Sequence, residues 1–104
     1  MARFDVYDHP DAAERKHIPY LLDVQNPYLD LLDTTVVIPL CKPDTLPTTV
    51  RDLHPVLTVQ GIEVILNTSD LGAVPSIMLR TPVVNLRAEQ PAIQAALDTL
   101  FGGY

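Results

Sequence analysis

Short segments with strand-like patterning fill the first three quarters of the chain. Alternation over residues 3–8 predicts a strand, with Phe4 and Val6 on one face and Arg3, Asp5 and Tyr7 on the other. A β-branched run at residues 34–40 predicts a strand buried on both faces. Further strands are expected at residues 20–25, 56–59, 62–66 and 73–79.

Local breaks in the pattern predict how these strands are connected. Gln60-Gly61 lies between two of them and favours a two-residue hairpin turn, because glycine readily adopts positive φ. Pro39 cannot donate to a sheet, so we expect it at an edge or a bulge. The proline-containing stretch 42–55 is expected to be a long loop, with a helical turn at 49–53 as an open alternative.

The end of the chain predicts one amphipathic helix. Pro91 suits its first turn, and Gly102-Gly103 suits its end, where a left-handed residue is favoured. Apolar residues recur at the spacing of one helical face, at Ile93, Ala96, Leu97, Leu100 and Phe101. The expected fold is therefore mainly β, a small sheet or barrel with a C-terminal α-helix packed against it.

Composition limits the size and the class of the protein. A length of 104 residues, 47% of them hydrophobic, supports a single folded domain over residues 1–104 and is compatible with a dimer. Seven Lys and Arg against thirteen Asp and Glu give a net charge of −6, which argues against direct binding to nucleic acid. Cys41 is the single cysteine, so an intrachain disulfide is excluded. With no apolar leader or membrane span in the pattern, we expect a soluble cytoplasmic protein.

The sequence offers only weak candidates for chemistry. Residues 8–11 with His17 match no metal-ligand spacing, and an exposed polar loop explains them better. Cys41 with His54 could form a nucleophile and base, but a buried inert thiol is the commoner case. Residues 68–70 are better explained as a polar turn than as a catalytic Ser-Asp pair. We therefore predict a protein that is not an enzyme and needs neither metal nor cofactor.

Six short segments together resemble one known family. Their order and spacing, from Phe4 to Gly103, are similar to those of the CcdB toxins, the gyrase poisons of toxin–antitoxin modules. The segments are Phe4-x-Val6-Tyr7, Leu22-Asp23-Val24-Gln25, Val37-Ile38-Pro39-Leu40, Leu53-x-Pro55-Val56, Thr68-x-Asp70-x-x-x-Val74-Pro75 and Ile93-x-x-Ala96-Leu97-x-x-Leu100-Phe101.

The resemblance implies a fold and a function. It implies an SH3-like barrel with a C-terminal helix, assembled as a two-fold homodimer. It also implies a toxin of a type II module that binds the DNA gyrase A subunit and traps the topoisomerase on cleaved DNA, by contact and without turnover. A CcdA-like antitoxin with a disordered tail would neutralise it, and the complex would repress its own operon, with DNA bound only through the antitoxin.

The resemblance also implies which residues contact gyrase. They form two clusters, the turn after the second predicted strand and the helix with its end. The first cluster is Asn26, Tyr28 and Leu29; the second is Gln90, Ile93, Asp98, Phe101, Gly102, Gly103 and Tyr104. Both clusters are expected near the dimer axis, with Tyr28 as an exposed aromatic anchor. For Ile93 and Phe101 the alternative is plain core packing.

The last residues depart from the family. Well-known members end Phe-Trp-Gly-Ile, whereas this chain ends Phe101-Gly102-Gly103-Tyr104. Loss of a tryptophan anchor removes about 2–4 kcal/mol of binding, which Tyr104 would replace only in part. Two alternatives therefore stay open: a degenerate family member that acts as a binding or co-repressor protein, and a MazF-like endoribonuclease. The second would need a basic RNA groove with an acid/base, for which Arg51, His54 and Arg80 are isolated candidates.

Overall fold

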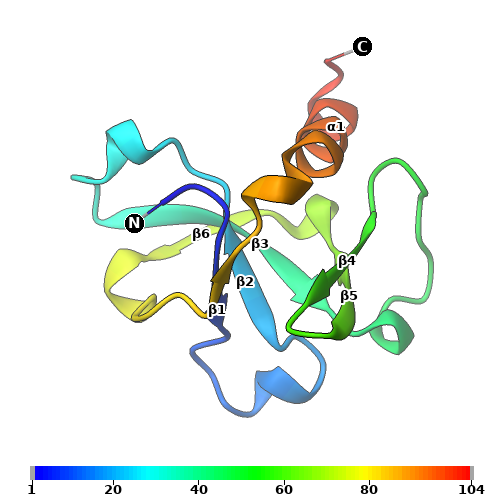
Figure 1. Cartoon of the computed structure of the whole chain (residues 1–104), viewed down its shortest axis with the longest axis horizontal. Coiled ribbons are helices and arrows are strands. Elements are labelled where there is room, and N and C mark those ends of the chain that lie inside the picture. Colours follow the sequence, from blue (N-terminus) through cyan, green and yellow to red (C-terminus); the bar gives the residue numbers. More distant parts are fainter. Residues whose placement is uncertain (1, 104) are drawn as a thin grey trace.

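The structure, a computed structural model, describes residues 2–103 and consists of a nearly closed, barrel-shaped sheet with one helix laid across it (Figure 1). The sheet order is β4-β5-β3-β2-β1-β7, and β6 pairs with β3 beside this path. The elements are β1 (Asp5–Asp8), β2 (Tyr20–Asp23), β3 (Thr34–Cys41), β4 (Val56–Val59), β5 (Ile62–Leu66), β6 (Gly72–Pro75), β7 (Val84–Asn85) and α1 (Gln90–Phe101). The mainly β fold with a C-terminal helix is as predicted.

Strand β3 is the centre of the barrel. It pairs with β2 along one side, while on its other side Thr34–Val37 pair with β6 and Leu40–Cys41 pair with β5. Pro39 lies between these two partners, opposite Leu21 of β2, and its carbonyl accepts from the amide of Asn67 at 3.0 Å. The expected edge position for Pro39 is therefore wrong. The proline is tolerated in a central strand because its missing N–H faces the point where β3 changes partner.

Helix α1 closes the main core over one face of the sheet. Ile93, Ala96 and Leu97 are buried there against inward residues of β1–β5 such as Leu22 and Ile38. A smaller cluster of Tyr7, Leu21, Val37 and Leu79 covers the opposite face of β1–β3. Both faces of the central strands are thus buried, as predicted for β3. No helix within residues 2–103 is long and apolar enough to cross a membrane.

The predicted hairpin turn is confirmed. Gln60 and Gly61 have φ of 50° and 81°, so both central residues of the β4–β5 turn are left-handed, as a type I′ turn requires. The helix begins and ends as its local signals indicate, with Pro91 in the first turn and Gly102 left-handed at φ 72°.

Two strand predictions need correction. Residues 3–4 do not belong to β1, because Phe4 has a left-handed φ of 73° and turns the chain before Asp5. The strand expected at 73–79 ends at Pro75, and Ser76–Met78 form a 3₁₀ turn. That turn is fixed by Ser76, whose amide donates to the Asp33 carbonyl at 2.8 Å and whose hydroxyl lies 2.6 Å from that of Thr35. The two-residue strand β7 carries no sequence pattern and was not predicted.

Candidate functional site

A groove of about 490 Å³ joins the turn after β2 to the end of α1. In Figure 1 the turn (cyan) and the helix end (red) lie on the same side of the barrel. One wall comes from the β2–β3 connection, the other from α1, and Leu71 and Val36 lie between them. The lining residues are Val24, Gln25, Asn26, Leu29, Val36, Leu71, Gln94, Leu97, Asp98, Phe101 and Gly103. Five residues of the two expected clusters therefore line one surface: Asn26, Leu29, Asp98, Phe101 and Gly103.

The turn wall is held by side-chain hydrogen bonds to the backbone. Pro27–Leu29 form a 3₁₀ turn that Asn26 caps, its Oδ1 accepting from the amide of Tyr28 at 3.0 Å. Gln25 spans the base of the loop: its Nε2 donates to the Thr34 carbonyl at 3.2 Å, and its Oε1 accepts from the Val36 amide at 3.0 Å. The loop is thus a fixed platform that presents the Tyr28 side chain outward.

The helix wall ends in a left-handed cap. The amide of Gly103 donates to the Asp98 carbonyl at 2.7 Å, and a Cβ at Gly103 would lie 3.2 Å from that of Asp98. One turn earlier, Gln94 donates its Nε2 to Oδ1 of Asp98 at 3.1 Å. The chain after Phe101 is therefore folded back closely against Asp98.

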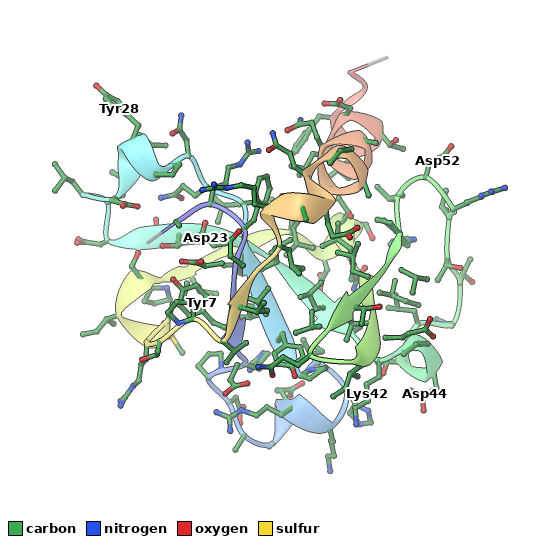
Figure 2. The ribbon with its side chains drawn as sticks, in the orientation of Figure 1. Tyr7, Asp23, Tyr28, Lys42, Asp44 and Asp52 are labelled. Atoms are coloured by element: carbon green, nitrogen blue, oxygen red, sulfur yellow. The ribbon has the colours of Figure 1, made fainter. Side chains whose placement is uncertain are left out.

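The aromatic and apolar side chains of the two clusters differ sharply in exposure. Tyr28 is 88% exposed and Phe101 is 69% exposed, whereas Ile93 is fully buried. Figure 2 shows Tyr28 pointing away from the body of the protein. The alternative of plain core packing is therefore correct for Ile93, which holds the helix on the barrel and has no exposed surface. That alternative does not describe Phe101.

Four expected site residues within residues 2–103 do not line the groove: Tyr28 and Ile93, described above, and Gln90 and Gly102. Gln90 is exposed at the first residue of α1, roughly 16 Å from Phe101 at about 1.5 Å rise per residue. Gly102 is exposed beside the groove without lining it. Tyr104 lies outside the described residues.

Gln25 and Gln94 both line the groove and are not among the residues predicted for the site. A signal existed for Gln94, which lies four residues before Asp98, the spacing at which side chains on a helix meet. Gln25 was visible only as part of a family segment. Its bonding to Thr34 and Val36 depends on β3 lying beside β2, which no local pattern states.

A buried carboxyl, that of Asp23, is hydrogen-bonded to a residue that lines the groove. Asp23 is 3% exposed, and its Oδ1 accepts from the amide of Gln25 at 2.9 Å. Burial raises the pKa of Asp23 to about 6, and the carboxylates of Asp5 and Asp30 act in the same direction. Burial, together with Asp5 and Asp23, likewise raises the pKa of Tyr7 to about 12. Figure 2 shows Tyr7 and Asp23 within the body of the protein.

The candidate nucleophiles lack a catalytic arrangement. His54 accepts the Val50 amide at Nδ1, 2.9 Å away, and its Nε2 lies 3.1 Å from Oγ of Ser69. Since Nδ1 accepts, Nε2 carries the proton and donates to Ser69, the reverse of what a general base does. The Cys41 thiol is buried with Asn67 as its hydrogen-bond partner, and burial raises its pKa. The His54–Ser69 and Cys41–Asn67 hydrogen bonds are thus explained as structural contacts.

A second cleft, of about 660 Å³, lies apart from the groove and shares no lining residue with it. Arg15 and Arg80 line it beside the exposed side chains of Ile77 and Met78. Two of the five arginines of an acidic protein therefore face one apolar-rimmed cleft. Among residues 2–103, no group of three or more His, Cys, Asp or Glu side chains is placed to hold a metal ion.

The fold places the protein among the small SH3-like barrel domains, with a groove formed where the C-terminal helix meets the barrel. The family model described as CcdB protein matches residues 3–103, so the chain belongs to the CcdB family. Proteins of this family are toxins of toxin–antitoxin modules that poison DNA gyrase and are not themselves enzymes. A comparison with curated proteins gives no significant match.

Proposed function

We propose that this protein is a cytoplasmic toxin that binds the A subunit of DNA gyrase through the groove and traps the enzyme on cleaved DNA. The observation that carries the proposal is the meeting of the two expected contact clusters along one groove. Phe101 stands exposed at its edge and Tyr28 projects from the adjoining turn. Exposed aromatic side chains on a rigid platform are typical anchors of protein interfaces.

The proposed toxin acts as a two-fold homodimer. Leu31 and Leu32 extend the exposed apolar surface of the turn after β2 beyond Tyr28. A symmetric pair would bury part of this surface and present each gyrase contact twice. Sedimentation equilibrium at micromolar concentration tests this point: we expect the mass of two chains, and a single-chain mass would contradict it.

Neutralisation is proposed to come from a CcdA-like antitoxin, and the complex is proposed to repress its own operon with DNA bound by the antitoxin. The net charge of −6 suits a toxin that leaves DNA contacts to its partner. Mobility-shift assays with the operator test this division. We expect the toxin alone to leave the DNA unshifted and to alter the shift only when the antitoxin is present.

Titration against purified gyrase A subunit is the experiment that decides the main proposal. We expect saturable binding, inhibition of supercoiling and accumulation of cleaved DNA when the B subunit and ATP are added. Phe101→Ala is the matched variant and should bind gyrase A more weakly, since it removes exposed surface at the groove while the core stays intact. Absence of binding by the unaltered protein at 100 μM, on the order of −5 kcal/mol, would contradict the proposal.

A second candidate function is a co-repressor that binds the antitoxin without poisoning gyrase. Gly102 favours it, because it stands where well-known CcdB toxins carry the bulky tryptophan anchor. Binding to the antitoxin together with unchanged gyrase supercoiling would favour this second candidate over the first.

A further inference from the structure

Arg3 connects three segments that are distant in the sequence. Its Nε donates to the carbonyl of Val24 at 3.2 Å, and its Nη2 donates to Oε1 of Gln94 at 3.4 Å. Its guanidinium carbon lies 4.7 Å from the centre of the Phe4 ring. The side chain thus joins the end of β2 to the middle of α1 while resting on an aromatic face.

A strained backbone directs Arg3 to this place. Phe4 adopts a φ of 73°, a left-handed conformation that is strained for a residue with a bulky side chain. The conformation is held from several sides: the Phe4 amide donates to the Asp23 carbonyl at 2.7 Å, its carbonyl accepts from Leu86 at 2.9 Å, and its ring is 3% exposed. Because the chain turns here, Arg3 folds back over the ring toward α1 and does not continue along β1.

The residue that Arg3 contacts on α1, Gln94, is itself hydrogen-bonded to a later residue of the helix. Gln94 accepts from Arg3 with Oε1 and donates with Nε2 to Asp98 at 3.1 Å, so both ends of its amide are in use. Asp98 in turn accepts the amide of Gly103 at its carbonyl. A chain of hydrogen bonds therefore runs from Arg3 through Gln94 and Asp98 to Gly103, the second residue after the helix.

Arg3 connects the two walls of the groove but is not itself one of its lining residues. Val24 belongs to the turn wall and Gln94 to the helix wall, and both line the groove. A guanidinium that bonds to both walls fixes their separation and the position of the helix end. A lysine has a single nitrogen and cannot reproduce two divergent donors.

We propose that Arg3 is a positioning residue for partner recognition. It sets the width of the groove and orders the end of α1, and it touches no partner itself. The affinity effect rests on the proposed binding of gyrase A at this groove, whereas the ordering of the helix end is a property of the free protein.

Two variants separate this role from charge and from stability. Arg3→Met keeps the apolar stem on Phe4 but removes the donors, and Arg3→Lys keeps the charge. Arg87→Met is the matched control, because it removes the same charge from an exposed arginine that lines neither groove wall. Each variant is examined by thermal unfolding, by nuclear magnetic resonance and by titration against gyrase A.

In the free protein, we expect Arg3→Met and Arg3→Lys to shift the side-chain amide resonances of Gln94. We also expect both to raise hydrogen exchange at the Gly103 amide at least fivefold, with exchange in β3 unchanged. Unchanged Gln94 and Gly103 signals would overturn the proposal, whether or not gyrase binds. Equal acceleration in β3 would also overturn it, because the effect would then be general destabilisation.

In the titration, we expect both Arg3 variants to bind gyrase A about tenfold more weakly and Arg87→Met to bind as the unaltered protein does. Arg3→Met combined with Gln94→Met should lose no more affinity than either alone, since both act through one contact. Full affinity in Arg3→Lys would indicate a charge effect and overturn the positioning role. If the unaltered protein fails to bind gyrase A, the proposed function fails, while the resonance data still decide the role of Arg3.

Discussion

Ile93 and Phe101 lie eight residues apart on the same broad side of α1, yet Ile93 is fully buried and Phe101 is 69% exposed. The helix extends past the barrel, so one apolar stripe serves two purposes. Its first half joins the core beside Leu97, and its last apolar residue stands at the edge of the groove. The apolar face of α1 thus contains buried residues that pack in the core and one exposed residue, Phe101, that is free to contact a partner.

This division predicts opposite consequences for two alanine substitutions. Ile93→Ala leaves a cavity in the core and should lower the free energy of unfolding by about 2–4 kcal/mol. Phe101→Ala should change it by no more than about 0.5 kcal/mol while weakening gyrase A binding about 30-fold or more. Urea unfolding and the gyrase A titration measure the two effects. A large stability loss in Phe101→Ala would show that its ring is packed in solution.

Restoring the family tryptophan at the helix end is the second test. Gly102→Trp places the residue of well-known CcdB toxins at a left-handed position, with φ of 72°, so we expect a stability loss of about 1 kcal/mol. We expect gyrase A affinity to rise about tenfold or more in spite of this loss. Gly102→Ala carries the same backbone strain without the ring and serves as the control. Equal affinity of the two variants would argue that position 102 lies outside the interface.

The buried carboxyl of Asp23 predicts a pH dependence of stability. Its pKa in the folded protein is about 6, above the ordinary 3.8, so the folded state binds this proton more tightly than the unfolded state. The stability from this proton is fully present below about pH 4 and is lost as pH rises through 6. Asp23→Asn keeps a carbonyl oxygen for the Gln25 amide and should gain about 2–3 kcal/mol relative to the unaltered protein at pH 8, with no gain near pH 4.

Chemical denaturation at pH 4, 6 and 8 measures this effect. Asp52→Asn is the control, because Asp52 is exposed, carries the same charge and is not one of the carboxylates that act on Asp23. Parallel stability profiles for Asp23→Asn and the unaltered protein would mean that Asp23 is ionised without penalty.

The single thiol should report on unfolding. Cys41 is 1% exposed, and burial raises its pKa, so both access and thiolate formation are suppressed in the folded state. We expect an aromatic disulfide reagent at pH 8 to react at the rate of global unfolding, and within seconds in denaturant. Fast reaction of the native protein would reveal local opening between β3 and β5.

The hairpin turn offers a stabilising substitution. Gln60 occupies a left-handed position at φ 50°, where asparagine is favoured. Gln60→Asn should therefore raise the free energy of unfolding by about 0.5 kcal/mol and the Tm by about 2–4 °C. Thermal unfolding tests this, with Gln60→Val expected to lower the Tm because a β-branched residue is strained there.

Local signals predicted those elements whose ends are set by single residues. Pro91 and Gly102 bounded the helix correctly, and Gly61 placed the hairpin, because each acts through its own φ and its immediate neighbours. Phe4 defeated the same reasoning. Its alternation with Val6 predicts a strand, but bonds to Asp23 and Leu86 hold it left-handed, and tertiary contacts override the pattern.

The site was predictable in parts but not as a unit. The family resemblance supplied Asn26 and Phe101, but no spacing states that the turn and the helix end meet at one groove. Arg3 was assigned to a strand face, so its bonds to Val24 and Gln94 could not be foreseen. Such contacts depend on long-range topology, which a one-dimensional pattern does not contain.

Because β3 pairs with β2, β5 and β6, we expect that no part of the barrel stays folded once β3 is released. Strands β2, β5 and β6 all pair with this one strand, so freeing it removes partners from both of its edges at once. Opening should therefore be all-or-none, without a partly folded species for a protease to attack. A partner bound at any point of the surface then protects every peptide bond of the barrel to the same degree, and its departure exposes them all together.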